Sequence, residues 1–389
     1  MIKLEPRGER SRLMSYLSPV LALLLTLLTG VILFTLLDVD PWHALVTILY
    51  TPISDTYGMA ELAVKATPIL LCAIGLSVVF KAQIWNIGAE GQLLMGGLFG
   101  SYMALQLLDV ESAWALPAVL LAGMLGGLFW AGIAAVLKVR FNSNEILTTI
   151  MMNYIALNIL LWAVHGPLKD PDGYNFPESA MFAASSMLPV LIDDTRVHFG
   201  LALALFAVVA VWVLMSRSFY GFQIKVMGLD ASAARLSGFK EKRLVYFALL
   251  LSGALAGLAG VSEVTGPIGQ LIPSISPGYG YAAIIVAFLG RLHPVGILLA
   301  TLLMALLYMG GEMAQIELGL PLALTGLFQG MLLFYLLACD VLIGFRLRWI
   351  GRSGSQGNTT APSQPLAQPL TQATSNTAST STQTSGAQG

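Results

Sequence analysis

The chain contains the stretch LSPVLALLLTLLTGVILFTLL (17–37), which is 21 residues long and has no charged side chain. A helix of roughly 20 apolar residues crosses the hydrocarbon core of a bilayer. The run is too long for the core of a secretory signal, which is ~7–15 residues, and no A-x-A cleavage motif follows it. We therefore interpret it as an uncleaved first transmembrane helix.

The rest of the chain has the same apolar character. Of its 389 residues, 56% are hydrophobic and 11% are charged, whereas soluble domains are about 25% charged. The mean hydropathy is +0.77. A net charge of −1 provides no basic field for nucleic acid, and Cys72 and Cys339 lie in apolar runs that offer no disulfide framework. Composition favours a polytopic membrane protein over a soluble enzyme, a secreted disulfide scaffold or a nucleic-acid binder.

Apolar stretches recur along the chain and predict an all-α membrane protein with about ten transmembrane helices. The predicted spans are 17–37, 61–80, 84–108, 113–137, 145–165, 198–215, 244–264, 277–290, 294–312 and 321–344. If the N-terminus is inside and all ten spans alternate, 17 of the 20 Lys and Arg residues lie inside. Only Lys169 and Arg196 then lie outside, and Lys65 lies within the second span. This bias predicts that both termini are cytoplasmic.

The eighth predicted span, 277–290, is shorter than the others. The Gly- and Pro-rich stretch TGPIGQLIPSISPGYG (265–280) precedes about ten strongly apolar residues, which as a helix would rise about 15 Å, half of a membrane. One interpretation is an ordinary outer loop followed by a tilted helix. The other is irregular backbone within the membrane, which is tolerated where it is buried in protein or lines a wet cavity.

Polar side chains inside the predicted spans are candidates for a substrate pathway. Glu90 lies six residues inside its span and is predicted to share a helical face with Asn86. Gln92 follows on the same helix, and Asn153 and Asn158 lie in the fifth span. Such residues line a pathway or clasp a neighbouring helix, and the sequence leaves both roles open. No chain of buried carboxylates or histidines crosses the membrane, which argues against an ion-coupled transporter.

Other residues in the spans predict helix packing. Glu61 and Lys65 are spaced i, i+4 and are expected to form an ion pair. Glycines recur at four-residue spacing, as in Gly96 and Gly100, in Gly123 and Gly127, and in Gly253 and Gly257. This spacing lets helix backbones approach closely. It predicts tight packing within the chain, with a subunit interface as the alternative.

The loop 216–243 predicts a short helix at the cytoplasmic face. Its centre reads MGLDASAARLSGFKEKR (227–243). Asp230 is a good N-cap and Gly238 suits the position after the helix, so about two helical turns are expected between them. A helix this short needs packing against the membrane domain or a partner. The alternative is a basic loop on the membrane surface.

Three blocks of sequence resemble one family. The segment GLDASAARLSGF (228–239) resembles the coupling loop of bacterial ABC importer permeases, in the family that includes branched-chain amino acid, simple-sugar and nucleoside permeases. The blocks KAQIWNIGAEGQLLMGG (81–97) and FNSNEILTTIMMNYIALNI (141–159) are similar to its sugar and nucleoside branch. The three blocks occur in order, and the resemblance covers roughly 60–345.

The resemblance implies a set of partners and a coupling element. Such permeases pair with an identical or paralogous permease in the bacterial plasma (inner) membrane. Separate ABC ATPase subunits dock on them, and an extracytoplasmic binding protein delivers substrate. The chain itself is then no enzyme, and it contains no G-x-x-x-x-G-K-[ST] motif. The implied coupling residues are Gly228, Asp230, Ala233, Ala234 and Gly238.

The expected substrate is a small polar solute without net charge, because the pathway candidates are amides, one carboxylate and hydroxyls. A nucleoside fits best and a simple sugar next. No cofactor or metal is expected, since the four histidines are scattered. A stand-alone secondary transporter or channel is the alternative, and a membrane-embedded enzyme is disfavoured.

The resemblance and the composition together predict three parts of the chain. Residues 1–16 form a cytoplasmic tail, 17–345 a transmembrane permease domain with its coupling loop at 216–243, and 353–389 a polar tail. That last segment has no charged residue and is rich in Ser, Thr, Gln and Ala. It is expected to be disordered, because it cannot bury a core.

Overall fold

Helices dominate the computed structural model, which describes residues 2–6, 12–173, 175–321 and 323–349. The chain forms two units. The smaller one contains most of a two-stranded sheet, in which β1 (Ile2–Pro6) pairs with β2 (Phe345–Trp349). This sheet was not expected from the sequence. The predicted polar tail, 353–389, lies outside the described residues.

The larger unit, Pro6–Arg346, is helical. Its long helices are α1 (Arg12–Leu36), α3 (Thr56–Lys81), α4 (Ala89–Gln106), α5 (Ala115–Phe141), α6 (Glu145–His165), α7 (Gly200–Arg217), α10 (Glu241–Glu263), α12 (Pro294–Leu318) and α13 (Ala323–Gly344). Its shorter helices are α2 (Pro41–Leu49), α8 (Phe219–Leu229), α9 (Ala231–Leu236) and α11 (Tyr279–Leu289), with 3₁₀ turns η1 (Thr51–Ile53) and η2 (Ala184–Ser186) and the π-helical turn η3 (Val264–Ile268).

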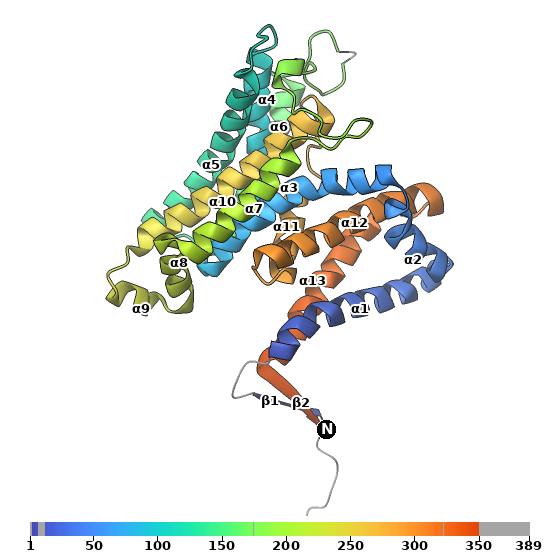
Figure 1. The fold of residues 1–389 in the computed structure, drawn as a ribbon, viewed down its shortest axis with the longest axis vertical. Coiled ribbons are helices and arrows are strands. Elements are labelled where there is room, and N and C mark those ends of the chain that lie inside the picture. The colour runs from blue at the N-terminus through green and yellow to red at the C-terminus, as the bar shows by residue number, and fades with distance from the viewer. Residues whose placement is uncertain (1, 7–11, 174, 322, 350–389) are drawn as a thin grey trace, which may run out of the picture. The chain divides into compact units, whose positions relative to one another are not determined.

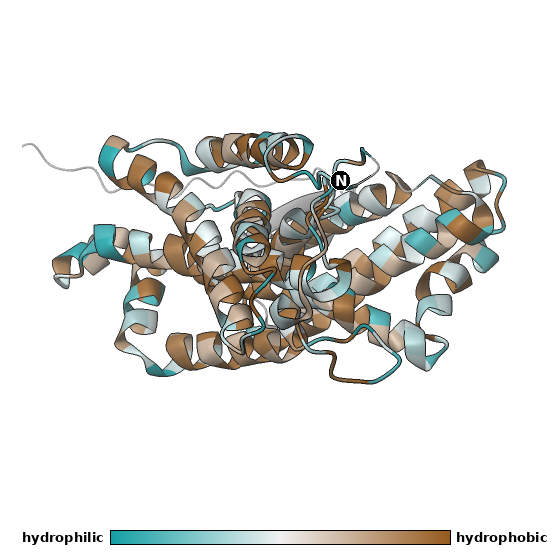
Figure 2. Ribbon diagram, turned by 90° about the horizontal axis from the view of Figure 1, so that it is seen from above, coloured by the Kyte–Doolittle hydropathy of each residue, from teal (hydrophilic) through white to brown (hydrophobic). Residues whose placement is uncertain are grey.

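Eight helices in the described part of the chain are long and apolar enough to cross a membrane, which confirms the all-α membrane class. The two remaining predicted spans correspond to α4 and α11. Helix α4 is less apolar because it carries Glu90, Gln92 and several glycines, and α11 has only 11 residues. Figure 2 shows apolar residues along most helices and hydrophilic residues concentrated at their ends and in the loops.

Helix α3 is the central helix of the larger unit. In its apolar window, 83% of the residues are buried, against 28% for α7. Figure 1 shows α4, α5, α6, α7 and α10 on one side of α3, and α1, α2, α12 and α13 on the other. This position explains how α3 is buried almost along its whole length.

Glycines allow α4, α5 and α10 to pack with their backbones in contact. A Cβ on Gly96 of α4 would lie 2.3 Å from the Cα of Gly257 of α10, and one on Gly127 of α5 would lie 2.3 Å from the carbonyl oxygen of Gly253. Real Cβ atoms do not approach other atoms this closely, so only glycine fits. The glycine spacing therefore serves packing within the chain, as predicted. It also places α4, which is poorly suited to lipid, inside protein.

We predict that Gly96→Ala destabilises the protein by about 1–3 kcal/mol, because the added methyl group meets fixed backbone. Gly330→Ala on α13 is the control, since open space surrounds that position, and it should not lower stability, because alanine is the better helix former. Thermal unfolding of the detergent-solubilised variants compares the two. Equal melting temperatures would contradict the close approach.

Candidate functional site

The chain is irregular between α3 and α4, over residues 82–88, and buried amides hold this segment. The Asn86 Oδ1 atom accepts hydrogen bonds from Gly88 N at 3.0 Å and from Gln92 Nε2 at 3.2 Å. The Asn86 Nδ2 atom donates to Ser252 Oγ of α10 at 3.2 Å. Because α4 begins only at Ala89, Asn86 is not helical, and the prediction that it shares a helical face with Glu90 is wrong.

Helix α6 supports the same segment from its other side. The Asn153 Nδ2 atom donates to the carbonyl of Ile87 at 2.9 Å, and Asn153 Oδ1 accepts from Gly91 N at 2.9 Å. The Thr149 Oγ1 atom accepts from Ile87 N at 3.1 Å. Asn86, Gln92 and Asn153 are all buried. In the described structure these three pathway candidates hold residues 82–88 against α4, α6 and α10. Their amides supply hydrogen-bond partners for backbone groups in and beside this irregular segment.

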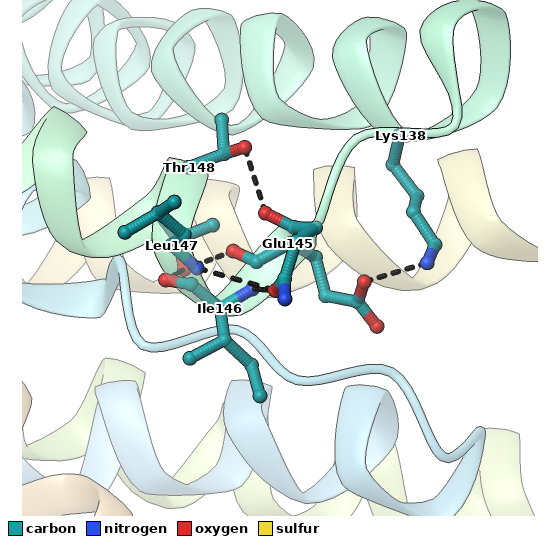
Figure 3. Close-up of polar contacts among 7 residues, drawn as sticks. Lys138, Glu145, Ile146, Leu147 and Thr148 are labelled. Carbon is teal, nitrogen blue, oxygen red and sulfur yellow. Dashed lines mark hydrogen bonds and ion pairs between the residues drawn. The ribbon is translucent and has the colours of Figure 1, made fainter.

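A cap and an ion pair fix the start of α6. The Asn144 Oδ1 atom accepts from Ile146 N at 3.0 Å, and the Thr148 hydroxyl donates to the Asn144 carbonyl at 2.8 Å. Lys138 Nζ of α5 lies 2.6 Å from Glu145 Oε2 (Figure 3). These contacts stabilise the tight turn between α5 and α6 and so determine where Asn153 meets residues 82–88.

A second irregular segment precedes α11. Helix α10 continues into the π-helical turn η3, and residues 269–278 are not helical before α11 begins at Tyr279. Helix α11 thus starts late in the predicted span and follows irregular backbone. This arrangement fits both interpretations of the eighth span, an outer loop with a tilted helix and irregular backbone within the membrane. π-Helical turns are rare in proteins, and those that occur are often found at functional sites.

The N-termini of α4 and α11 meet at Glu90. The Glu90 Oε2 atom accepts a hydrogen bond from Gly280 N, in the first turn of α11, at 2.7 Å. A Cβ on Gly280 would lie 2.3 Å from Glu90 N, so the two helix starts are in backbone contact. Helix N-termini carry unpaired N–H groups and a partial positive charge, which a carboxylate neutralises. Glu90 is 6% exposed, so this contact is shielded from water.

A cluster of charges that the sequence did not place together lies where the start of α3, the end of α12 and the loop before α7 meet. The Arg196 guanidinium hydrogen-bonds both carboxylate oxygens of Glu61, and these bonds raise the pKa of Arg196 above its ordinary value. Lys65 Nζ lies 2.7 Å from Glu312 Oε1. The expected Glu61–Lys65 pair is therefore wrong, because each residue has a partner on another element.

Glu263 belongs to the same region but is only 8% exposed, and its Oε2 atom has no hydrogen-bond partner among the described residues. The positive charges of Lys65 and Arg196 lie within electrostatic range of its carboxyl group. The sequence could not predict this cluster, because its residues come from separate elements and no regular spacing in the chain relates them.

The helix predicted in the cytoplasmic loop is present as α9. The Asp230 Oδ1 atom accepts from Ser232 N at 2.8 Å, as expected of an N-cap, and Gly238 has a φ of +78°. Ala233 is half-buried and Ala234 is buried, at 1% exposure. Helix α8 before it was not predicted. It begins at the N-cap Ser218, and the stacked rings of Tyr220 and Phe247 pack it against α10.

Gly228, near the end of α8, touches the end of α3. A Cβ on Gly228 would lie 1.9 Å from the carbonyl oxygen of Lys81, the last residue of α3. Irregular residues 82–88 follow directly. The surface of the loop instead presents Leu229 and Leu236, which are 88% and 91% exposed. The loop thus has one face seated on the membrane helices and two leucines exposed outside them.

Asn158 differs from the other pathway candidates because it is exposed. It lies on the outer face of α6, and its Nδ2 atom donates to the Tyr154 carbonyl of its own helix at 2.7 Å. The structure therefore brings Asn86, Glu90, Gln92 and Asn153 together and leaves Asn158 apart.

We predict that Glu90→Leu lowers stability by about 1–3 kcal/mol, because it leaves Gly280 N and neighbouring N–H groups without an acceptor. Glu90→Gln keeps an acceptor oxygen and should lose less. Thermal unfolding in detergent measures both, and a Leu variant as stable as the Gln variant would argue against the junction.

Comparison with known proteins identifies a matching family and several relatives. Residues 58–337 match the family described as "Branched-chain amino acid transport system / permease component". The glucose ABC transporter permease protein of Haloferax volcanii is 33% identical over 89% of this chain and 93% of its own length. The guanosine ABC transporter permease protein of Bacillus subtilis is 29% identical over 88% of this chain and 99% of its own length.

A third relative, the nucleoside ABC transporter permease protein of Lactococcus lactis, is 26% identical over 82% of this chain and 90% of its own length. No solved structure matches the chain. The matched residues, 58–337, include both irregular segments, the charge cluster and the α8–α9 loop. The chain belongs to the branched-chain amino acid-type permease family and is a multi-pass membrane subunit of an ABC transporter, with ATP hydrolysis supplied by other chains.

Proposed function

We propose that this chain is one of two permeases in an ATP-driven importer that moves a small polar solute into the cytoplasm. The observation that carries the proposal is the α8–α9 loop, which has exposed leucines on one side and the Gly228 contact with α3 on the other. A partner that binds the exposed side can act on the membrane helices through that contact. The partners are two ABC ATPase subunits, an identical or paralogous permease and an extracytoplasmic binding protein.

In this proposal the larger unit crosses the membrane ten times, with α4 and α11 as the two spans that are shielded by protein. Both termini and the α8–α9 loop are cytoplasmic, which agrees with the bias of Lys and Arg in the sequence. Residues 17–345 then form the permease domain. The charge cluster of Glu61, Arg196, Lys65 and Glu312 lies at the outer side.

The coupling element is Gly228, Asp230, Ala233, Ala234 and Gly238. Asp230 and Gly238 begin and end α9, and buried Ala234 packs it against the protein. Movement of α8 would reach Lys81 and then residues 82–88, which end at the junction of α4 and α11. Nucleotide can drive this change only if the ATPases bind the two conformations with different affinities.

The substrate we propose is a nucleoside, as the relatives from Bacillus subtilis and Lactococcus lactis carry nucleosides by name. A simple sugar is the second candidate, because the relative from Haloferax volcanii is named a glucose permease. Both are neutral and polar, in agreement with a described interior that offers amides and paired charges.

We predict that Leu236→Glu reduces co-purification of the ATPase subunits at least fivefold while membrane insertion persists, because the change places a charge on the exposed docking face. Ile192→Glu is the matched control. It alters an exposed apolar residue in the loop before α7, on the opposite side of the membrane in this topology, and should leave co-purification unchanged.

Deletion of residues 230–238, or Ala234→Arg, should abolish uptake without preventing insertion, since each destroys α9 or its packing. Uptake by cells that express the complete importer measures this. A deletion variant that still imports the solute would show that the coupling assignment is wrong.

A further inference from the structure

The exposed face of α6 carries a stripe of aromatic and amide side chains. Tyr154 and Trp162 are 59% and 67% exposed, and Asn158 lies between them. The spacing 154, 158, 162 places all three on one face of the helix. We refer to Tyr154, Asn158 and Trp162 as the α6 stripe.

The α6 stripe differs from the exposed faces of α5 and α7 that are formed by apolar residues alone. Helix α5 exposes Leu121, Leu125 and Phe129, and α7 exposes Phe206 and Val209. These apolar faces suit contact with lipid tails. A carboxamide does not, because lipid offers it no hydrogen-bond partner.

Asn158 lies too deep to reach water along its own helix. It is seven residues from the end of α6 at His165, which is about 10 Å of helix. Its described hydrogen bond, to the Tyr154 carbonyl, uses a donor of the amide. The Oδ1 acceptor is therefore available on an exposed face at membrane depth, and polar groups in this setting usually face a wet cavity or another protein chain.

The α6 stripe is continuous with the junction of broken helices. Asn153, next to Tyr154 in the chain, donates from Nδ2 to the hydroxyl of Tyr281 at 3.2 Å. Tyr281 lies in the first turn of α11 beside Gly280 and is 43% exposed. The exposed stripe thus adjoins the contact between Glu90 and Gly280, where irregular backbone and helix N-termini meet.

Two grooves flank Trp162. One, of about 360 Å³, is lined by Tyr154, Asn158 and Trp162. The other, of about 390 Å³, lies between Trp162, Phe99 and Tyr102. Both grooves are open to the surface, so each can form one wall of a binding site but does not enclose a solute by itself. Aromatic rings beside an amide offer stacking surfaces for a flat ring and hydrogen bonds for its polar edge.

We infer that the α6 stripe, together with Tyr281, forms this chain's wall of the solute pathway and contacts a neutral, ring-bearing solute by stacking and by the Asn158 amide. The inference rests on the proposed importer function, in which a second permease supplies the opposite wall. It assigns the pathway to an exposed face and not to the buried amides Asn86, Gln92 and Asn153.

Cysteine accessibility in the assembled importer tests the location. Cys72 and Cys339, both buried, are first replaced by Ser, and ATP-dependent uptake by this background is confirmed. Asn158→Cys and the control Phe206→Cys, at an exposed position of α7, are then treated with a charged, membrane-impermeant thiosulfonate. Tyr154→Cys is a second stripe position in case Asn158→Cys fails to assemble.

We expect the stripe cysteines to react at least tenfold faster than the α7 control, because only the pathway is wet at that depth. Equal rates, or no reaction at any position, in an importer that transports would overturn the inference and leave the proposed function standing. Loss of ATP-dependent uptake in the background would instead count against the proposed function.

Uptake tests the ring contact. Guanosine and glucose are used as separate probes, with the binding protein at one fixed level. Trp162→Leu should lower uptake of the transported probe roughly fivefold or more, since stacking on a ring is worth about 1–3 kcal/mol. Trp162→Phe should restore it to within about twofold. Equal uptake by all three proteins would overturn stacking at Trp162.

Discussion

The close approach of α4 and α10 at Gly96 and Gly257 is the constraint on which the rest of the structure depends. Backbone contact at these glycines lets α4 lie inside protein although it carries Glu90 and Gln92. A helix of this composition would be poorly solvated by lipid. Because α4 is enclosed, its N-terminus and the irregular residues before it are held at a fixed place within the bundle, where buried amides can satisfy them.

Two breaks in regular structure then meet at one point. Residues 82–88 lead into α4 and residues 269–278 lead into α11, and the Glu90 carboxylate bridges the two helix starts. On the cytoplasmic side, as proposed, Gly228 connects the α8–α9 loop to the end of α3, directly before the first break. A movement of the loop therefore reaches the junction through a few backbone contacts and needs no buried ion relay. This agrees with a transporter that takes its energy from ATPase partners.

Much of the fold followed from local sequence. Runs of apolar residues predicted the membrane helices, the spacing of glycines predicted their packing, and Asp230 and Gly238 predicted α9, because each of these signals acts within a few residues. Helix α8 was missed because its aromatic residues are held by rings on other segments, such as Phe247. The Glu61–Arg196 pair was missed because its partners are 135 residues apart. The amide Asn153 was compatible with two roles from the sequence, and its partners on residues 87 and 91 could not be predicted because they lie about 60 residues away in the chain.

The source of energy is the most direct test of this account. The complete importer and the permease alone are reconstituted in liposomes, and uptake of guanosine and glucose is measured with ATP at the cytoplasmic side or with only a proton or sodium gradient. We expect uptake by the complete importer to require ATP hydrolysis and the binding protein, and the permease alone to show none under either gradient. Robust uptake by the permease alone, driven by an ion gradient, would contradict the account and favour a stand-alone transporter.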